Sequence, residues 1–222
     1  PEVVNSNKYS VNSVSYEERL RKVILSGSNG LLYIFDLNNL SNKNVYSKSS
    51  RESYKIKVSD CFISEGFFEN KVFPSEVISK AHRRSANYSV FSKQIPELVF
   101  SCGADRLISM NDLRTNKCEL SFEAHNEDIT CLDTNYFNQY SLLSSSFDKS
   151  VALWDLRNLK SKVHSFLFHE DEVAKIQFSN LVDNIFVSSG LDSKICIWDI
   201  ERIGKGTDDV TLNIQGEENI CE

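Results

Sequence analysis

The sequence has 222 residues, 41% of them hydrophobic, and a formal net charge of −6. This hydrophobic content is enough for a sizeable core, and because no run of 18 apolar residues occurs, no segment is predicted to cross a membrane. Residues 1–124 carry 17 basic and 14 acidic groups, whereas residues 125–222 carry 8 basic and 17 acidic groups. The acidic second half disfavours direct DNA binding and suits a basic partner, or it serves solubility alone.

The six cysteines show no Cys-x-x-Cys pair and no ligand-like spacing to the four histidines, so no metal or other cofactor is predicted. Four of them, Cys102, Cys118, Cys131 and Cys196, fall in predicted strands, where cysteine acts as a small buried hydrophobe. This usage is typical of a reduced, intracellular compartment.

The first unit of the chain is predicted over residues 10–40. Its three short strands are expected at 10–16, 22–26 and 31–37. Phe35 stands where two later units have tryptophan. The turn at 28–30 is interpreted as one residue shorter than the later turns, and it lacks their aspartate. Packing alone is therefore expected to hold this unit together.

Residues 41–73 are an insertion in the repeated pattern. Their first part, 41–55, is polar and rich in serine and lysine, which predicts a long exposed loop. Residues 53–73 contain enough tyrosine, isoleucine, valine and phenylalanine to form an extra strand or a packed flap. Residues 75–79 are predicted as an outer strand that leads into His82.

Three further units are predicted over residues 75–124, 125–168 and 169–214. In each unit a histidine precedes three strands, and a turn aspartate separates the second strand from the third. The expected strands are 86–92, 98–103 and 107–113; then 129–133, 141–146 and 151–156; then 173–179, 185–190 and 194–200. Asn111 replaces the tryptophan of the later units, so the polar network of its unit is expected to be incomplete.

The landmarks of these units recur 43 and 44 residues apart. They are His82, His125 and His169, with Asp105, Asp148 and Asp192, and with Asn111, Trp154 and Trp198. A period of about 40 to 45 residues with an early histidine and a late Trp-Asp pair is the pattern of a four-stranded WD-repeat blade. We therefore predict an all-β fold, a partial WD40 β-propeller over residues 1–222, with about four blades here and seven in the complete ring.

The resemblance to WD-repeat proteins implies a hydrogen-bonded chain of four side chains inside each blade. Its members would be His125, Ser144, Asp148 and Trp154, and then His169, Ser188, Asp192 and Trp198. A buried polar chain is costly unless every member is satisfied, and when satisfied it fixes strand register. These residues are therefore interpreted as structural, not as catalytic or metal-binding.

The last two units carry a more specific resemblance. The segments SFDKSVALWDLRNL at 146–159 and SSGLDSKICIWDIERIG at 188–204 resemble the histone-binding WD-repeat family of the retinoblastoma-binding type, which includes the small subunit of chromatin assembly factor 1. The resemblance implies a non-enzymatic scaffold in nuclear complexes that assemble or modify chromatin. It also implies that histone H4 binds on the side of the propeller and that the histone H3 tail binds, in some members, on the top face.

The resemblance places candidate histone contacts at two positions. The side groove would use Asp208, Asp209 and Leu212, although this loop is shorter than in the family and lacks its paired prolines. Top-face contacts would come from Asn87, Thr130, Phe147 and Ala174. Of the inward positions only Asn87 is a good polar contact, so the H3-tail mode is expected to be altered or lost. Phe147 is either an exposed contact or an ordinary turn residue.

A second hypothesis comes from Trp154-Asp155-Leu156-Arg157. A WD pair followed by x-Arg resembles the box by which some propellers dock to the adaptor of cullin-type ubiquitin ligases. Arg157 and Arg114 would make the docking contacts, or each would simply pair with a nearby aspartate. An enzyme is not predicted, because no Ser-His-Asp or Cys-His setting occurs and the repeat accounts for every histidine except His164.

Overall fold

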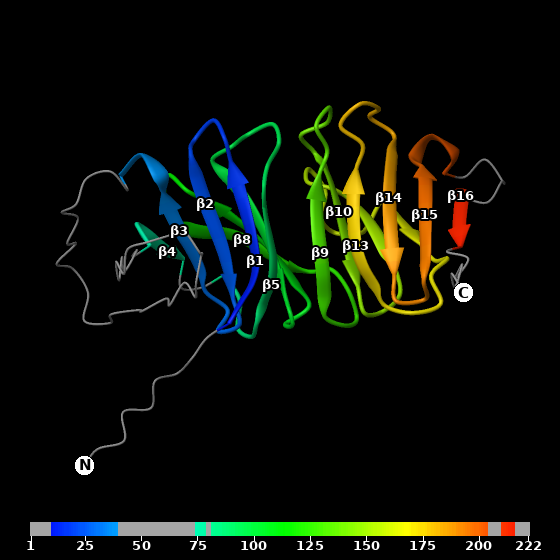
Figure 1. The fold of residues 1–222 in the computed structure, drawn as a ribbon, viewed down its shortest axis with the longest axis horizontal. Helices are drawn as coiled ribbons and strands as arrows, with labels where there is room; N and C mark the ends of the chain where they lie inside the picture. The colour runs from blue at the N-terminus through cyan, green and yellow to red at the C-terminus, as the bar shows by residue number, and fades with distance from the viewer. Residues whose placement is uncertain (1–9, 40–73, 79–80, 204–209, 216–222) are drawn as a thin grey trace, which may run out of the picture.

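The computed structural model describes residues 10–39, 74–78, 81–203 and 210–215. These residues form four antiparallel sheets of four strands each, arranged as consecutive blades of a β-propeller (Figure 1). Each sheet is a meander in which neighbouring strands follow one another along the chain. The predicted all-β propeller with about four blades is confirmed.

The strands are short and regular. Blade 1 contains β1 (Val11–Glu17), β2 (Lys22–Gly27), β3 (Leu32–Asp36) and β4 (Glu76–Ile78), and blade 2 contains β5 (Ala86–Phe91), β6 (Leu98–Gly103), β7 (Leu107–Asp112) and β8 (Lys117–Glu123). Blade 3 contains β9 (Ile129–Thr134), β10 (Ser141–Ser146), β11 (Val151–Asp155) and β12 (His164–Phe166), and blade 4 contains β13 (Val173–Phe178), β14 (Ile185–Gly190), β15 (Lys194–Asp199) and β16 (Val210–Gln215). Two single 3₁₀ turns, Leu37–Asn39 and Ile200–Arg202, are the helical segments of the described residues, and neither is long enough to span a membrane.

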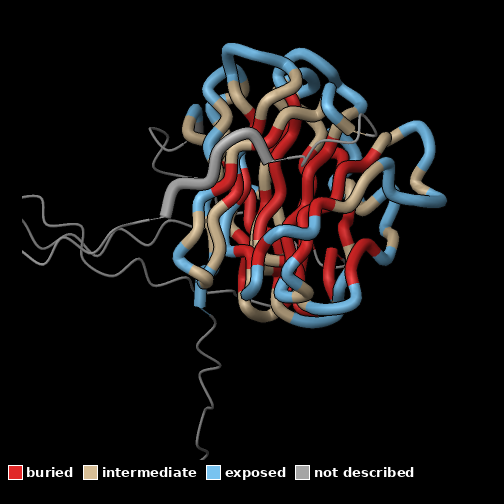
Figure 2. The backbone as a smooth tube through the Cα atoms, turned by 90° about the vertical axis from the view of Figure 1, so that its right-hand side faces the viewer, coloured by how far each residue is buried: buried red, intermediate tan, exposed pale blue. Residues whose placement is uncertain are grey.

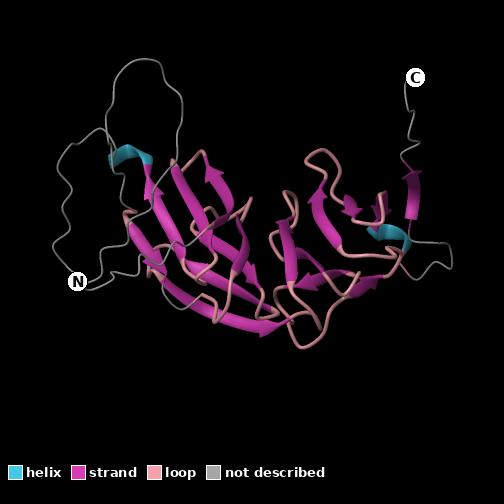
Figure 3. Cartoon of the chain, turned by 60° about the horizontal axis from the view of Figure 1, so that its bottom comes forward, coloured by secondary structure: helices cyan, strands magenta, loops and turns pink. Residues whose placement is uncertain are grey.

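The blades follow one another along an arc (Figure 3). Their first strands, β1, β5, β9 and β13, contact one another in sequence and run side by side, whereas the fourth strands form the outer wall (Figure 1). Buried residues concentrate in the strands, and exposed residues concentrate in the loops at the two ends of the sheets (Figure 2). The loops at each end of the sheets are therefore exposed to solvent.

The predicted start of the second blade at residue 75 is wrong. Glu76 and Ile78 of β4 pair with Ile34 and Leu32 of β3, so this strand closes the first sheet and not the second. The sequence repeat and the sheet are offset by one strand. The strand that precedes the histidine of one repeat pairs with the open edge of the preceding blade. The insertion at 41–73 lies outside the described residues.

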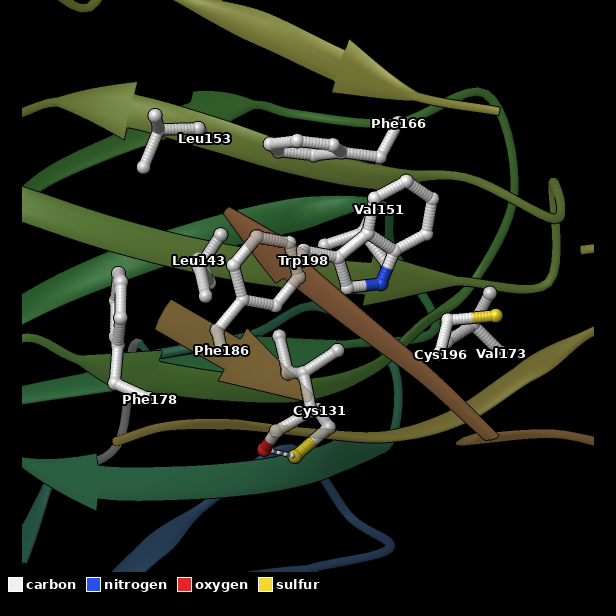
Figure 4. Packing of buried hydrophobic residues seen from close by; sticks show 11 residues of the cluster. Cys131, Leu143, Val151, Leu153, Phe166, Val173, Phe178, Phe186, Cys196 and Trp198 are labelled. Carbon is white, nitrogen blue, oxygen red and sulfur yellow. Dashed lines mark hydrogen bonds between the residues drawn. The ribbon is translucent and has the colours of Figure 1, made fainter. Parts of the chain in front are cut away.

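The core lies between the blades. One cluster of buried apolar side chains joins blades 1 and 2, a second joins blades 2 and 3, and a third joins blades 3 and 4. In the third cluster, Trp198 stacks on Phe186 at 5.8 Å between ring centroids, and Phe166 of blade 3 packs edge-on against both rings (Figure 4). Blades 2 and 3 have a neighbour on both faces, so their second strands β6 and β10 are buried almost throughout, whereas β13 of the end blade 4 alternates between buried and exposed residues.

Candidate functional site

The predicted polar chain of blade 3 is brought together by β10, β11 and the turns that flank them. Nδ1 of His125 lies 3.0 Å from Oδ2 of Asp148, and Nε2 of His125 lies 2.7 Å from Oγ of Ser144. Trp154 donates from Nε1 to the same Oγ at 2.9 Å. One proton arrangement satisfies all three contacts: the carboxylate accepts from Nδ1–H, and the serine hydroxyl donates to Nε2 while accepting from the indole.

Blade 4 repeats this chain with nearly the same distances. Nδ1 of His169 lies 3.0 Å from Oδ2 of Asp192, and Nε2 lies 2.8 Å from Oγ of Ser188. Trp198 donates to that Oγ at 2.8 Å. In both blades the histidine ring is fully engaged and buried, so it is not presented to a substrate.

The expectation of an incomplete chain in blade 2 is wrong. His82 contacts Asp105 at 3.0 Å and Ser101 at 2.9 Å, as in the later blades. Asn111 then donates from Nδ2 to Oγ of Ser101 at 3.1 Å. The amide supplies the N–H that the tryptophan indole supplies elsewhere, so a much smaller side chain completes the network.

The interpretation of the blade 1 turn is also wrong. Asn29 occupies the place of the turn aspartate, because its Oδ1 accepts from Leu31 N–H at 3.2 Å just as Oδ1 of Asp105 accepts from Leu107 N–H at 3.3 Å. Gly30 has a φ of 79°, matching the left-handed residue that follows each later turn aspartate, so the turns have equal length. Packing is not the sole support, since Oγ of Ser26 donates to Oγ of Ser89 in blade 2 at 2.8 Å.

The pKa of Asp148 lies below its ordinary value. Burial opposes this shift, but hydrogen bonds from His125 and Ser150 outweigh it. The pKa values of Asp105 and Asp192 are lowered in the same way, by hydrogen bonds that overcome desolvation. The three turn carboxylates are therefore charged, structural acceptors. Among the described residues no group of histidine, cysteine and acidic side chains could hold a metal ion.

Two of the predicted top-face residues serve contacts between blades. Asn87 donates from Nδ2 to the carbonyl oxygen of Ile129 at 2.9 Å, and Thr130 donates from Oγ1 to that of Val173 at 2.6 Å. Asn12 makes the equivalent bond to the carbonyl of Ala86 at 2.8 Å, a contact that the sequence analysis missed. The signal was present, because Asn12 holds the same position in β1 that Asn87 holds in β5. Ala174, at this position in blade 4, is exposed and has no side-chain donor.

Phe147 is an exposed apolar residue, and Leu191 is a second one at the equivalent position of the next blade. The side chain of Phe147 is 42% exposed, and Leu191, at the same turn position of blade 4, is 62% exposed. The backbone N–H of Phe147 donates to the carbonyl of Asp128 at 3.0 Å, and that of Leu191 donates to the carbonyl of Glu172 at 2.8 Å. Leu191 was not predicted as a contact, although its register with Phe147 could have identified it.

The two loops that accept these backbone bonds are rich in acidic residues. We call the surface formed by Glu127, Asp128, Phe147, Glu170, Asp171, Glu172 and Leu191 the top surface. Lys149 of blade 3 donates from Nζ to the carbonyl of Glu170 at 2.8 Å, and Lys194 pairs with the Glu170 carboxylate at 2.7 Å. The bond from Lys149 connects the turn of blade 3 to the loop that precedes β13, whereas the Lys194 pair lies within blade 4.

The candidate side groove falls mostly outside the described residues. Asp208 and Asp209 lie in the stretch 204–209, which is not described. Leu212 lies in β16, where its backbone pairs with Ile197 of β15. The grouping of these three residues stays a prediction.

The candidate adaptor contacts are held by their own aspartates. Arg157 makes a forked contact with Asp155, at 2.9 Å from Nε and 2.7 Å from Nη2, and Arg114 makes the same fork with Asp112. The hydrogen bond from Arg157 lowers the pKa of Asp155 to about 2. Both guanidinium groups remain exposed at the end of the sheets opposite to the top surface, and that of Arg157 lies 4.8 Å from the ring centroid of Tyr140.

Comparison with known proteins identifies the repeat itself. Residues 116–155 and 160–199 each match the family model described as WD domain, G-beta repeat. Each match begins near the outer strand of one blade and ends with the third strand of the next, which is the offset seen at β4. An F-box/WD repeat-containing protein A-like protein from Dictyostelium discoideum is 27% identical over 162 residues, which cover 73% of this chain and 13% of that relative.

Proposed function

We propose that this chain, a β-propeller built from WD repeats, is a non-enzymatic scaffold that binds a basic segment of a histone on its top surface. WD repeats indicate a protein-interaction scaffold, and propellers of this family are typically not catalytic. The proposal adds a partner and a surface to that general role. By the same reasoning the partners include subunits of chromatin complexes, and the place of action is the nucleus.

The observation that carries the proposal is the composition of the top surface. Five acidic residues lie in the two loops that accept the backbone bonds of the exposed Phe147 and Leu191, and Lys149 hydrogen-bonds from the blade 3 turn to the blade 4 loop. Exposed aromatic and aliphatic side chains on ordered loops are typical anchors of protein interfaces. The acidic rim selects a basic partner and accelerates its association.

The resemblance to histone-binding WD-repeat proteins supports histones as that partner. Histone tails of H4 and H3 combine lysine and arginine with scattered apolar side chains, which is the chemistry that the top surface complements. The two inward polar groups that could have assisted, Asn87 and Thr130, are already engaged between blades. The turn residues of blades 3 and 4 therefore carry the recognition.

The test is a titration of the full-length protein with H4 and H3 tail peptides at two ionic strengths. We expect Phe147→Ser with Leu191→Ser to abolish most binding, and Asp171→Asn with Glu172→Gln to weaken it several-fold at low salt, because an exposed ion pair contributes about 0.2 to 1 kcal/mol. The difference should shrink at high salt. Asp183→Asn with Glu201→Gln, which changes the net charge equally at other exposed positions, is the matched control.

A second function, substrate receptor of a cullin-type ubiquitin ligase, is favoured by one observation. The forked Arg114 and Arg157 recur at equivalent ends of blades 2 and 3, on a surface distinct from the top surface. The relative from Dictyostelium is named as an F-box/WD protein, which concerns that protein alone. Pull-down of the full-length protein with histones and with the ligase adaptor separates the two functions. Absence of histone binding, with adaptor capture lost in Arg157→Ala, would replace the first proposal by the second.

A further inference from the structure

A groove on the outer wall between blades 2 and 3 has the geometry of a second binding site, which we call the outer groove. Its volume is about 300 Å³. Residues 123–126, in the connection from β8 to β9, form one side, and the loop 159–162, which precedes β12, forms the other. The ring of Trp154 contributes to its floor. The outer groove is built from different residues than the top surface.

The outer strand of blade 3 is short beside the outer groove. β12 has three residues and pairs with β11 only as far as Leu153, which lies opposite His164. In blade 4 the equivalent Trp198 has an outer-strand partner, Val210, and in blade 2 Asn111 has Cys118. Trp154 lacks such a partner in β12, so the loop 159–162 replaces the strand and leaves a hollow beside it.

The floor of the outer groove is suited to an apolar side chain. Phe122 packs edge-on against Trp154 with 5.0 Å between ring centroids, and Leu159 packs partly buried against the same cluster. Trp154 is fixed in place by its hydrogen bond to Ser144. Since Trp154 is 4% exposed, an incoming apolar side chain would contact mainly Leu159 and the small accessible part of the ring.

The rim of the outer groove carries positive charge without an internal partner. Lys160 and Lys162 are exposed, and neither makes an ion pair with any residue that the structure describes. Nζ of Lys162 lies 3.5 Å from Oγ of Ser165. On the opposite side Glu123 is paired with Arg106 at 3.5 Å, so its carboxylate is already matched. The net field at the rim therefore attracts carboxylates.

We propose that the outer groove binds an acidic peptide segment, with an apolar or aromatic side chain on the Trp154 floor and flanking carboxylates at Lys160 and Lys162. Its charge is opposite to that of the top surface, so one scaffold would hold a basic partner on the top and an acidic partner on the wall. The two sites share no residue and should operate independently.

The test uses the full-length protein and a fluorescein-labelled synthetic peptide, Glu-Asp-Phe-Glu-Asp, followed by fluorescence anisotropy at low ionic strength. We expect Lys160→Glu with Lys162→Glu to weaken binding about tenfold, since two favourable ion pairs become repulsive. The matched control, Arg83→Glu with Lys117→Glu, changes the net charge equally at exposed positions and should stay within about twofold of the parent. A peptide with serine in place of phenylalanine should also bind about tenfold more weakly, because the ring loses its burial.

Three outcomes would overturn the proposal: no binding of the acidic peptide by the parent, equal losses in the test and control variants, or equal binding of the serine peptide. Melting curves of each variant ensure that the comparison is made on folded protein. A histone peptide titrated against Lys160→Glu with Lys162→Glu reports on the top surface separately. Unchanged histone binding with lost acidic-peptide binding supports the outer groove, whereas failure of histone binding in the parent concerns the proposed function alone.

Discussion

The carboxylate of Asp133 in blade 3 lies 2.9 Å from Nζ of Lys93 in blade 2. The same oxygen accepts the backbone N–H of Phe178 in blade 4 at 2.7 Å, so one side chain connects three consecutive blades. Burial raises the pKa of Asp133. Lys93 and the backbone N–H groups of Phe178 and Thr134 act against that rise. The ion pair therefore has a structural role that the blade pattern did not reveal.

We predict that Asp133→Ala lowers the free energy of unfolding by about 3 kcal/mol. The change leaves the buried N–H of Phe178 without its acceptor and the largely buried Lys93 without its negative partner. Lys93→Met should cost less, since Asp133 keeps its backbone donors. Urea denaturation of both variants measures the difference. Equal losses in the two variants would show that the link to blade 4 contributes nothing.

Trp154 combines a large buried ring with a hydrogen bond to Ser144. Trp154→Ala should therefore lower the free energy of unfolding by about 3 to 5 kcal/mol. Trp154→Phe retains most of the packing and removes the indole donor, for which we expect a cost of about 1 to 2 kcal/mol. A melting temperature of Trp154→Ala within a degree or two of the parent would contradict the role of this residue in the blade.

Much of the fold could be predicted from the sequence, because the repeat is marked by residues that few other side chains can replace. The histidine, the turn aspartate and the tryptophan each need a particular donor or acceptor at a fixed place, so their spacing is visible in one chain. The matches to the WD repeat at 116–155 and 160–199 confirm that pattern. Blade 1 was harder to interpret, because Asn29 and Gly30 fill positions held in later blades by aspartate and by arginine, lysine or serine.

The donors of the contacts between blades share a strand position, but their acceptors could not be predicted from the sequence. The acceptors of Asn12, Asn87 and Thr130 are backbone carbonyl groups, which every residue has and no sequence pattern identifies. The outer groove lies beside β12, whose length of three residues no sequence pattern indicated. Leu191 could have been found only through its register with Phe147, because exposure itself leaves no pattern in the sequence.

A substitution of Asn111 tests whether its amide group stabilises blade 2 as much as the indole of Trp154 stabilises blade 3. Its side chain is fully buried, and its Nδ2 donates to Ser101 at 3.1 Å, but its Oδ1 has no partner among the described residues. Asn111→Ala should lower the free energy of unfolding by about 1 to 2 kcal/mol, less than Trp154→Ala, because the amide buries less apolar surface and already leaves one acceptor unsatisfied. Denaturant titrations of the two variants provide the measurement. A larger loss for Asn111→Ala than for Trp154→Ala would overturn this ranking.

The turn aspartates should make the protein sensitive to acid. The pKa of Asp148 is lower in the folded state than its ordinary value, so the unfolded chain binds a proton first as the pH falls. The ionised carboxylate therefore contributes fully to stability above its ordinary pKa of about 3.9. This contribution is lost as the pH falls from there through the lower pKa of the folded state. Asp105 and Asp192 act in the same direction.

We expect Asp148→Asn to be less stable than the parent at neutral pH, since the amide cannot replace the carboxylate opposite His125. The gap between the two proteins should narrow as the pH falls below about 4 toward the folded pKa, because only the parent loses the ionised contact over that range. Asp183→Asn, which alters an exposed aspartate, is the control and should keep a constant gap. Urea denaturation at a series of pH values decides the matter. A gap for Asp148→Asn that widens as the pH falls would reverse the sign of the linkage and show that the folded state holds the neutral acid.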